Sequence, residues 1–404
     1  MTGLTLLLRN EAARVIALLL ILIGAKVALL GYGGLARPLP WPTGSARTWG
    51  NNVLETISSR SLNKEAREAL TAGYYEGLMN EGSRLSAMNR LITDNRPPTF
   101  EVRSQPDRRE SGDFLFYELI PDSDIPDYQD SRARYRLKTN SAGFADKEYS
   151  VEKPEGVRRI AVMGDSITRG QGAPFGGTYE ALLENKLNES HRSPSIRGYE
   201  ILNFAVGSYT ITQQLGMAVE RAAGYDPDVY VFGISPLSVY RSWGQHIALL
   251  TEAGADLKYD YLRQLVRDAD LKPGEPIGVF DAKLAKFRLP TIRWALSEMA
   301  AHAKRKGATM LVVLVTDVAT TAEIEEMFLG IRPILKELNI PTVDLLDTFA
   351  GRDDLASLRV ADNDRHPNAA GHQLLFERLY EKVMNDPALR QIVLGPATVP
   401  EGNR

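Results

Sequence analysis

From residue 158 onward, short apolar runs alternate with stretches of helical spacing. Such alternation is typical of a parallel β-sheet with helices on both faces. We expect strands at 159–163, 200–206, 229–234, 309–315 and 341–346, and helices at 177–189, 210–223, 290–306, 321–338 and 369–385. Residues 241–289 interrupt this alternation after the third strand, where a long insertion can shape a substrate cleft or form a lid.

The first apolar run stops at a Gly-Asp-Ser sequence that ends in Ser166. In open α/β sheets, ligands bind outside the carboxyl ends of the strands, so Ser166 lies where chemistry is usually found. Taken alone, this serine is better explained as a helix cap. A second stretch, 362–368, contains His366 among acidic residues and reverses that judgement. Together the two stretches supply the serine, base and carboxylate that nucleophilic acyl transfer needs.

Three motifs occur in an order that is specific in combination. Residues 164–168 are GDSIT, residues 203–208 are NFAVGS, and residues 364–372 are DRHPNAAGH. With these motifs the chain resembles the SGNH (GDSL) hydrolase family over residues 158–385, and the stretch 137–146 is similar to the lead-in of some bacterial members. The resemblance implies a flavodoxin-like, three-layer α/β fold with a five-stranded parallel sheet. It also implies hydrolysis or transfer of ester-linked acyl groups.

The resemblance implies a role for each residue at a matching position. Ser166 is then the nucleophile, and His366 is the base that takes its hydroxyl proton. The imidazole needs a carboxylate that holds its tautomer and stabilises the imidazolium. The commonest family pattern has Asp three residues before the histidine, where this chain has Asn363. We therefore expect Asp364 to be the acid, with Asp362 as the alternative.

Acyl transfer also needs hydrogen-bond donors for the developing oxyanion. The candidates are the backbone N–H groups of Ser166 and of Gly207, which matches the family's second-block glycine and whose lack of a Cβ allows close approach. The family usually adds an Asn side chain after the third strand, where this chain has Ser235, a weaker donor, and nearby Ser238. Loss of one such donor typically lowers turnover about 100- to 1000-fold. No metal or organic cofactor is implied, because the triad supplies both the nucleophile and the proton transfer.

Charge and composition narrow the range of partners. A net charge of -3 gives no reason to expect nucleic acid. The chain has no cysteine and therefore no disulfides, and its five histidines are too scattered for a zinc site. We expect a substrate that carries an ester, either a small molecule or a carbohydrate.

Residues 15–33 form an apolar stretch about as long as the roughly 20 residues that span a bilayer. Arg9 and Arg14 precede it, so the positive-inside rule predicts a single-pass protein of the inner or cell membrane. Its N-terminus is then cytoplasmic and its catalytic domain periplasmic or extracellular. A signal peptide cleaved near residues 34–36 is the main alternative, although the run is long for one. The opposite orientation is a further alternative, because arginines also follow the stretch.

These patterns divide the chain into four parts. We expect a cytoplasmic tail and transmembrane anchor at 1–35, a linker and ancillary α/β segment at 36–157, the hydrolase domain at 158–390 and a C-terminal tail at 391–404. The ancillary segment has β-like runs at 114–120 and 135–138. Its aromatic residues need burial, so we expect it to pack on the hydrolase domain.

The function that follows is a serine esterase of the SGNH type. We expect it to remove acyl groups, such as O-acetyl, from an envelope or exported polysaccharide or from another ester. One alternative is a polysaccharide O-acetyltransferase that uses the same triad. Another is a catalytically degenerate module that binds polysaccharide or serves as a scaffold, which the missing Asn motivates.

Overall fold

The computed structural model describes residues 106–126, 135–362 and 364–396. The predicted membrane anchor, the linker and the beginning of the ancillary segment lie outside these ranges. No helix within the described ranges combines the length and the apolarity that crossing a bilayer requires.

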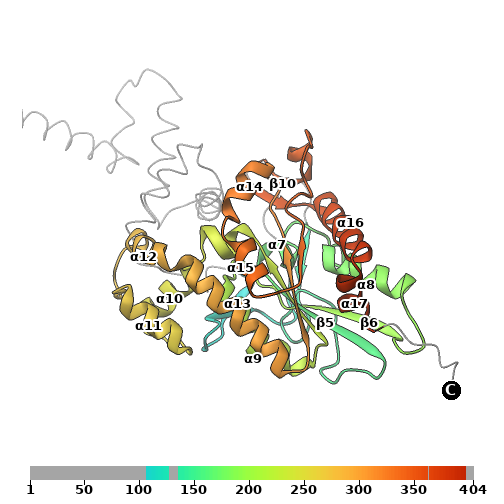
Figure 1. Ribbon diagram of the computed structural model, residues 1–404, viewed down its shortest axis with the longest axis horizontal. Helices are drawn as coiled ribbons and strands as arrows, with labels where there is room; N and C mark the ends of the chain where they lie inside the picture. The colour runs from blue at the N-terminus through green and yellow to red at the C-terminus, as the bar shows by residue number, and fades with distance from the viewer. Residues whose placement is uncertain (1–105, 127–134, 363, 397–404) are drawn as a thin grey trace, which may run out of the picture. The chain divides into compact units, whose positions relative to one another are not determined.

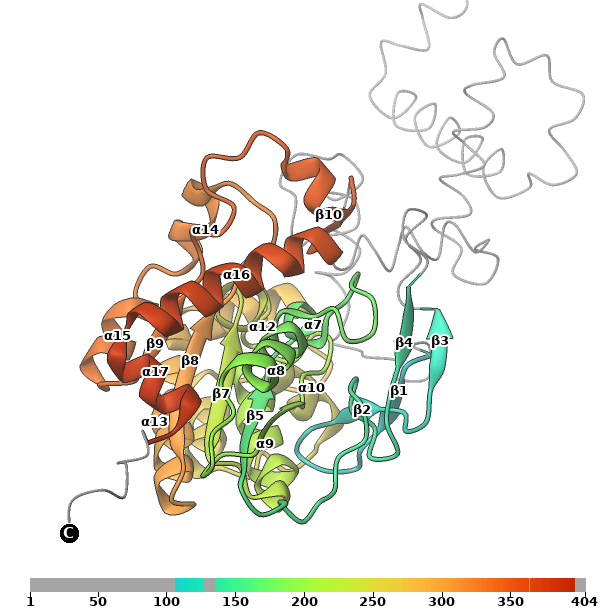
Figure 2. The ribbon, with the colours of Figure 1, turned by 90° about the vertical axis from the view of Figure 1, so that its right-hand side faces the viewer.

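A five-stranded parallel sheet forms the centre of the fold (Figures 1 and 2), which confirms the predicted α/β class. The strand order is β6-β5-β7-β8-β9, so the first strand of the sheet lies between the second and the third. This is the flavodoxin-like order, whose switch point lies between its first and third strands. The strands are β5 (Val157–Met163), β6 (Gly198–Asn203), β7 (Val229–Ile234), β8 (Thr309–Leu314) and β9 (Thr342–Asp344).

Side chains alternate between the two faces of the sheet, as the period of a strand requires. Ile160 and Val162 face one helical layer, whereas Ala161 and Met163 face the other. The first layer lies in front of the sheet in Figure 2 and contains α8 (Tyr179–Ser190), α16 (Ala369–Asn385) and α17 (Pro387–Leu394). The second contains α9 (Ile211–Glu220), α13 (Arg288–Arg305), α14 (Thr321–Met327) and α15 (Ile331–Glu337).

Several predicted element bounds differ from the structure by a few residues, and two differences change the organisation of the chain. The single helix expected at 321–338 is two helices, α14 and α15, because Gly330 between them adopts a φ of +87° that ends the helical path. The C-terminal tail expected from residue 391 begins inside α17. Asp386 caps that helix, and its Leu389 and Val393 are buried in the core, so the domain extends past the predicted boundary.

The ancillary segment forms two short antiparallel pairs, in each of which one strand, β2 or β4, lies at a predicted β-like run and the other was not predicted. They are β1 (Arg108–Glu110) with β2 (Tyr117–Leu119), and β3 (Asp124–Pro126) with β4 (Arg136–Lys138). Leu115, Tyr117 and Leu119 are buried in the same core as the sheet and α9. The described part of the segment is therefore packed on the hydrolase domain.

The insertion at 241–289 folds around a small core of its own. Trp243, Phe280 and Leu284 pack there with Phe114 of the ancillary segment. Buried His246 contacts the Thr212 hydroxyl at 2.8 Å and the Phe114 carbonyl at 2.6 Å. The helices of the insertion are α10 (Gln245–Ala253), α11 (Asp260–Asp268) and α12 (Ile277–Leu284). Across the domain, including the insertion, shorter helical turns lie at Ala222–Tyr225, Leu237–Arg241, Ala285–Phe287 and Leu355–Leu358.

Candidate active site

Ser166 is the first residue of a short helix, α7 (Ser166–Arg169), that follows β5 directly. The Asp165 side chain caps this helix by accepting a hydrogen bond from the Ile167 N–H at 3.1 Å. The turn is tight, since a Cβ on Gly164 would lie 2.4 Å from the Thr168 side chain. Strand β5, Gly164 and the cap together place Ser166 at the carboxyl edge of the sheet.

His366 reaches Ser166 from a separate pair of strands, β10 (Arg359–Ala361) and β11 (Asp364–Pro367). Its Nε2 lies 2.7 Å from the Ser166 Oγ across 200 residues of sequence. Its Nδ1 lies 2.5 Å from Asp364 Oδ1, and that same oxygen accepts the His366 backbone N–H at 3.0 Å. The structure thus joins the three predicted side chains into one hydrogen-bonded chain.

Asp364, rather than Asp362, is the carboxylate beside the imidazole. Asp362 is exposed at the turn between β10 and β11, whereas Asp364 points inward to His366. In an extended strand, residues two apart lie on the same side, so the spacing of two lets Asp364 and His366 meet. Asp362, the alternative candidate for the triad acid, therefore lies away from the imidazole.

The charges of this pair suit a general base. Burial disfavours the imidazolium of His366, but the Asp364 carboxylate, with smaller contributions from Asp165 and Asp317, outweighs burial and raises the pKa of His366. Burial also acts to raise the pKa of Asp364, yet the charge and hydrogen bonds of His366 lower it. Asp364 therefore stays ionised and keeps His366 basic.

We expect kcat/KM for ester hydrolysis to fall at acid pH with a midpoint above 6.5, the ordinary pKa of histidine. Below that midpoint, protonated His366 cannot accept the Ser166 proton, so activity is lost as the pH falls through the raised pKa. A pH–rate profile on a neutral ester checks this. A midpoint at or below 6.5 would contradict the pairing with Asp364.

The backbone N–H groups of Ser166 and Gly207 remain the predicted oxyanion donors, and the structure shows what surrounds each of them. The N–H of Ser166 is at the start of α7, where a helix has no acceptor of its own for it. The loop that carries Gly207 is joined to this turn by a hydrogen bond from the Val206 N–H to the Gly164 carbonyl at 3.3 Å. On its other side, the Tyr117 hydroxyl donates to the Gly207 carbonyl at 3.1 Å.

The Ser235 hydroxyl, predicted to be a third oxyanion donor, is engaged with other groups in the structure. It donates to the Asp165 carboxylate and accepts the Leu237 N–H at 3.1 Å. The Ser238 hydroxyl is also engaged locally, since it donates to the Ser235 carbonyl at 3.0 Å. The Ser235 hydrogen thus satisfies the buried Asp165 carboxylate, which needs donors, and the Ser238 hydrogen stabilises its own turn. Neither is presented to an oxyanion.

Sequence reasoning missed a buried ion pair close to the triad. Asp317 follows β8 at the carboxyl edge and pairs with Arg241 at 2.9 Å. Its charge contributes to the raised pKa of His366. Asp317 could have been predicted as a site residue, because it closely follows a buried strand at the carboxyl edge of the sheet. Its pairing with Arg241 could not, because nothing in the sequence connects the two residues.

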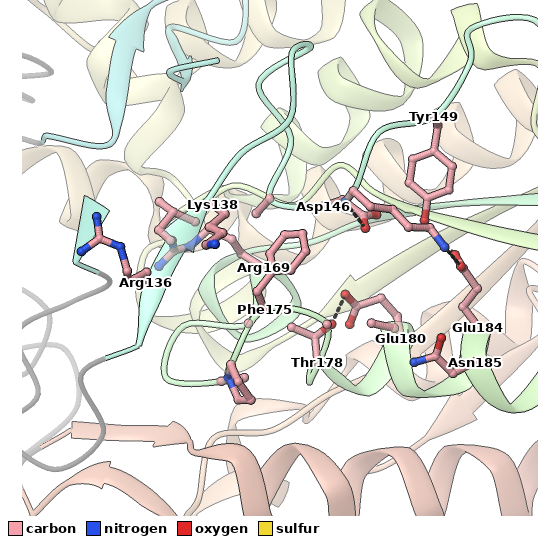
Figure 3. A pocket seen from close by; sticks show the side chains of 18 residues that line it. Arg136, Lys138, Asp146, Tyr149, Arg169, Phe175, Thr178, Glu180, Glu184 and Asn185 are labelled. Atoms are coloured by element: carbon pink, nitrogen blue, oxygen red, sulfur yellow. Dashed lines mark hydrogen bonds and ion pairs between the residues drawn. The ribbon is translucent and has the colours of Figure 1, made fainter. Parts of the chain in front are cut away.

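A pocket adjoins this site between the lead-in stretch, α8 and the loop after α7 (Figure 3). Arg169 and Gly170 from the end of α7 line it, but the three triad residues do not. Burial raises the pKa of Asp146 to about 7 and that of Glu180 to about 8. Among the described residues, no group of three or more His, Cys, Asp or Glu side chains could hold a metal ion.

Comparison with known proteins gives one family and several similar folds. The model of the GDSL-like Lipase/Acylhydrolase family matches residues 162–374. The crystal structure of TesA is similar at 15% identity, covering 57% of this chain and 99% of that one, with a TM-score of 0.37. An acetylxylan esterase from Geobacillus stearothermophilus has 17% identity, coverage of 56% and 94%, and a TM-score of 0.39. No match was found among curated proteins.

The family match covers more than half of the chain, and its range contains every strand of the central sheet except part of the first. It includes both Ser166 and His366, which the structure joins. This chain belongs to the GDSL-like lipase/acylhydrolase family and is an ester hydrolase of the SGNH type.

Proposed function

We propose that this enzyme removes short acyl groups, such as acetyl, from a polyhydroxylated substrate, namely an envelope or exported polysaccharide. The observation that carries the catalytic part is the hydrogen-bonded chain from Ser166 through His366 to Asp364. The same chain of contacts argues against a degenerate scaffold, because that role would not need them.

The proposed mechanism uses the groups already described. His366 Nε2 takes the proton of the Ser166 hydroxyl while the oxygen attacks the ester carbonyl. The N–H groups of Ser166 and Gly207 stabilise the tetrahedral oxyanion, and His366 then protonates the leaving sugar hydroxyl. Water, activated by the same imidazole, releases the acyl group from Ser166 and restores the enzyme.

The pocket beside α7 supports a polar substrate. Its basic side chains are those of Arg136, Lys138, Lys147 and Arg169, and its carboxyl groups are those of Asp146, Glu180 and Glu184. A long acyl chain would have to lie against these polar groups, which is unfavourable, whereas sugar hydroxyls can hydrogen-bond to them. The Phe175 ring, 50% exposed at the pocket, offers an apolar surface on which one face of a sugar ring can pack.

The location of the enzyme is proposed from the sequence alone. The apolar stretch 15–33 would anchor it in the inner or cell membrane and hold the catalytic domain on the periplasmic or extracellular side. An exported polysaccharide is accessible there. Recovery of the full chain in the membrane fraction after an alkaline wash, with the domain sensitive to protease added from outside, is the expected result.

Chain-length preference tests the substrate class. We expect the full-length enzyme in detergent to hydrolyse p-nitrophenyl acetate with a kcat/KM well above that for the long-chain palmitate ester. It should also release acetate from O-acetylated oligosaccharides. A preference for palmitate would contradict the proposal. Acetyl transfer to an added oligosaccharide, in place of acetate release, would identify the enzyme as a transferase with the same triad.

A further inference from the structure

Arg108 lies in the ancillary segment, outside the residues that match the family. Its side chain is only 5% exposed. The guanidinium carbon lies 5.0 Å from the centre of the Tyr117 ring on the neighbouring strand. The Asp107 carboxylate lies 3.5 Å from its Nε. The β1–β2 pair therefore holds a buried cation in one place.

The Arg108 guanidinium lies next to Gly207. A Cβ on Gly207 would lie 2.7 Å from Arg108 Nη2 and 3.7 Å from the guanidinium carbon. A side chain at this position would require the Arg108 guanidinium to shift, so the glycine permits the close approach seen here. Arg169 from the nucleophile helix lies on the same side, with its Nε 3.8 Å from that Cβ position.

The position of Arg108 matters because the oxyanion hole lacks its usual third donor. Ser235 stands where the family has Asn, and its hydroxyl is engaged with Asp165. Two backbone N–H groups remain, and Gly207 carries one of them. In a site that excludes water, a fixed positive charge stabilises a developing negative charge far more than it would in bulk solvent.

We propose that Arg108 completes the oxyanion hole from outside the family domain, with its guanidinium stabilising the negative charge that develops beside Gly207. Tyr117, whose hydroxyl donates to the Gly207 carbonyl, is a positioning residue for the same corner. The ancillary segment is then part of the active site. This inference rests on the proposed function and concerns the same site.

Substitution of Arg108, compared with its neighbour on the same strand, tests the proposal. We expect Arg108→Gln to lower kcat for p-nitrophenyl acetate about 100- to 1000-fold, the loss typical of one oxyanion donor, with a KM close to that of the wild type. Arg108→Lys keeps the charge and should recover much of the loss. Arg109→Gln, at the exposed neighbouring position, should match the wild type.

A fluorophosphonate probe provides a second readout, because its attack by Ser166 develops the same oxyanion. Its labelling rate should fall in parallel with kcat in Arg108→Gln and recover in Arg108→Lys. Melting temperatures of all the variants separate chemistry from folding. A purely structural role would lower the melting temperature of Arg108→Gln together with its kcat, whereas the proposed role lowers kcat and leaves the melting temperature close to that of the wild type.

The outcomes separate the inference from the proposed function. An active wild type with equally active Arg108→Gln overturns the role of Arg108 and leaves the esterase intact. A loss that Arg108→Lys does not recover also overturns it, because charge is then not what matters. A folded wild type with no esterase activity or probe labelling overturns the proposed function, and this inference with it.

Discussion

Ser166→Ala is expected to lower kcat for p-nitrophenyl acetate about 10⁴-fold or more, the scale on which removal of a catalytic nucleophile acts. The Ser166 Oγ is the atom 2.7 Å from His366 Nε2, and no other hydroxyl in the described residues contacts that imidazole nitrogen. The fold should be unaffected, because the substitution removes one oxygen from a side chain at the start of α7. Steady-state kinetics and the melting temperature measure the two effects separately.

Covalent labelling supplies the control for this prediction. A fluorophosphonate probe should label the wild type and Ser195→Ala, which alters an exposed serine in the loop after α8, but not Ser166→Ala. Labelling of Ser166→Ala at the wild-type rate would mean that another residue is the nucleophile. Equal rates of ester hydrolysis in the wild type and Ser166→Ala would lead to the same conclusion.

Asp364→Asn is expected to lower kcat about 10⁴-fold, the loss seen when a triad carboxylate becomes an amide. The amide can donate to Nδ1, which then favours the wrong tautomer and leaves Nε2 unable to accept the Ser166 proton. The charge that raises the pKa of His366 is also lost, so the acid limb of the residual activity should move to lower pH.

Asp362→Asn is the matched control, because it makes the same chemical change at an exposed position two residues away. We expect its kcat/KM to stay within a few-fold of the wild type. If Asp362→Asn were the variant with the large loss, the acid assignment would be reversed. Similar large losses in both variants would instead indicate that the turn between β10 and β11 needs both carboxylates.

Several features of the fold follow from local patterns. The strand β5 and its neighbours have side chains with a period of two and apolar residues on both faces, which only a sheet covered on both sides can bury. The helix at 369–385 is found with the predicted bounds, because Asn368 caps it and its apolar spacing is uninterrupted. These signals depend on neighbouring residues alone.

Other predictions needed more than the pattern. The helix expected at 321–338 kept its apolar spacing, but the backbone conformation of Gly330 divides it. The tail expected from 391 had no motif to mark it, and only its packing on the first helical layer shows that it belongs to the domain.

By itself, the sequence determined the α/β class, the family and the candidate residues Ser166 and His366. Each of these follows from patterns or motifs of residues that are close together in the chain. The tertiary structure decided which aspartate meets the imidazole, where the Ser235 hydroxyl points and which cation rests on Gly207. These are contacts between segments that are distant in the chain, or orientations set by such contacts. Their distances depend on how the turns and layers pack, and no local pattern of residue types encodes that.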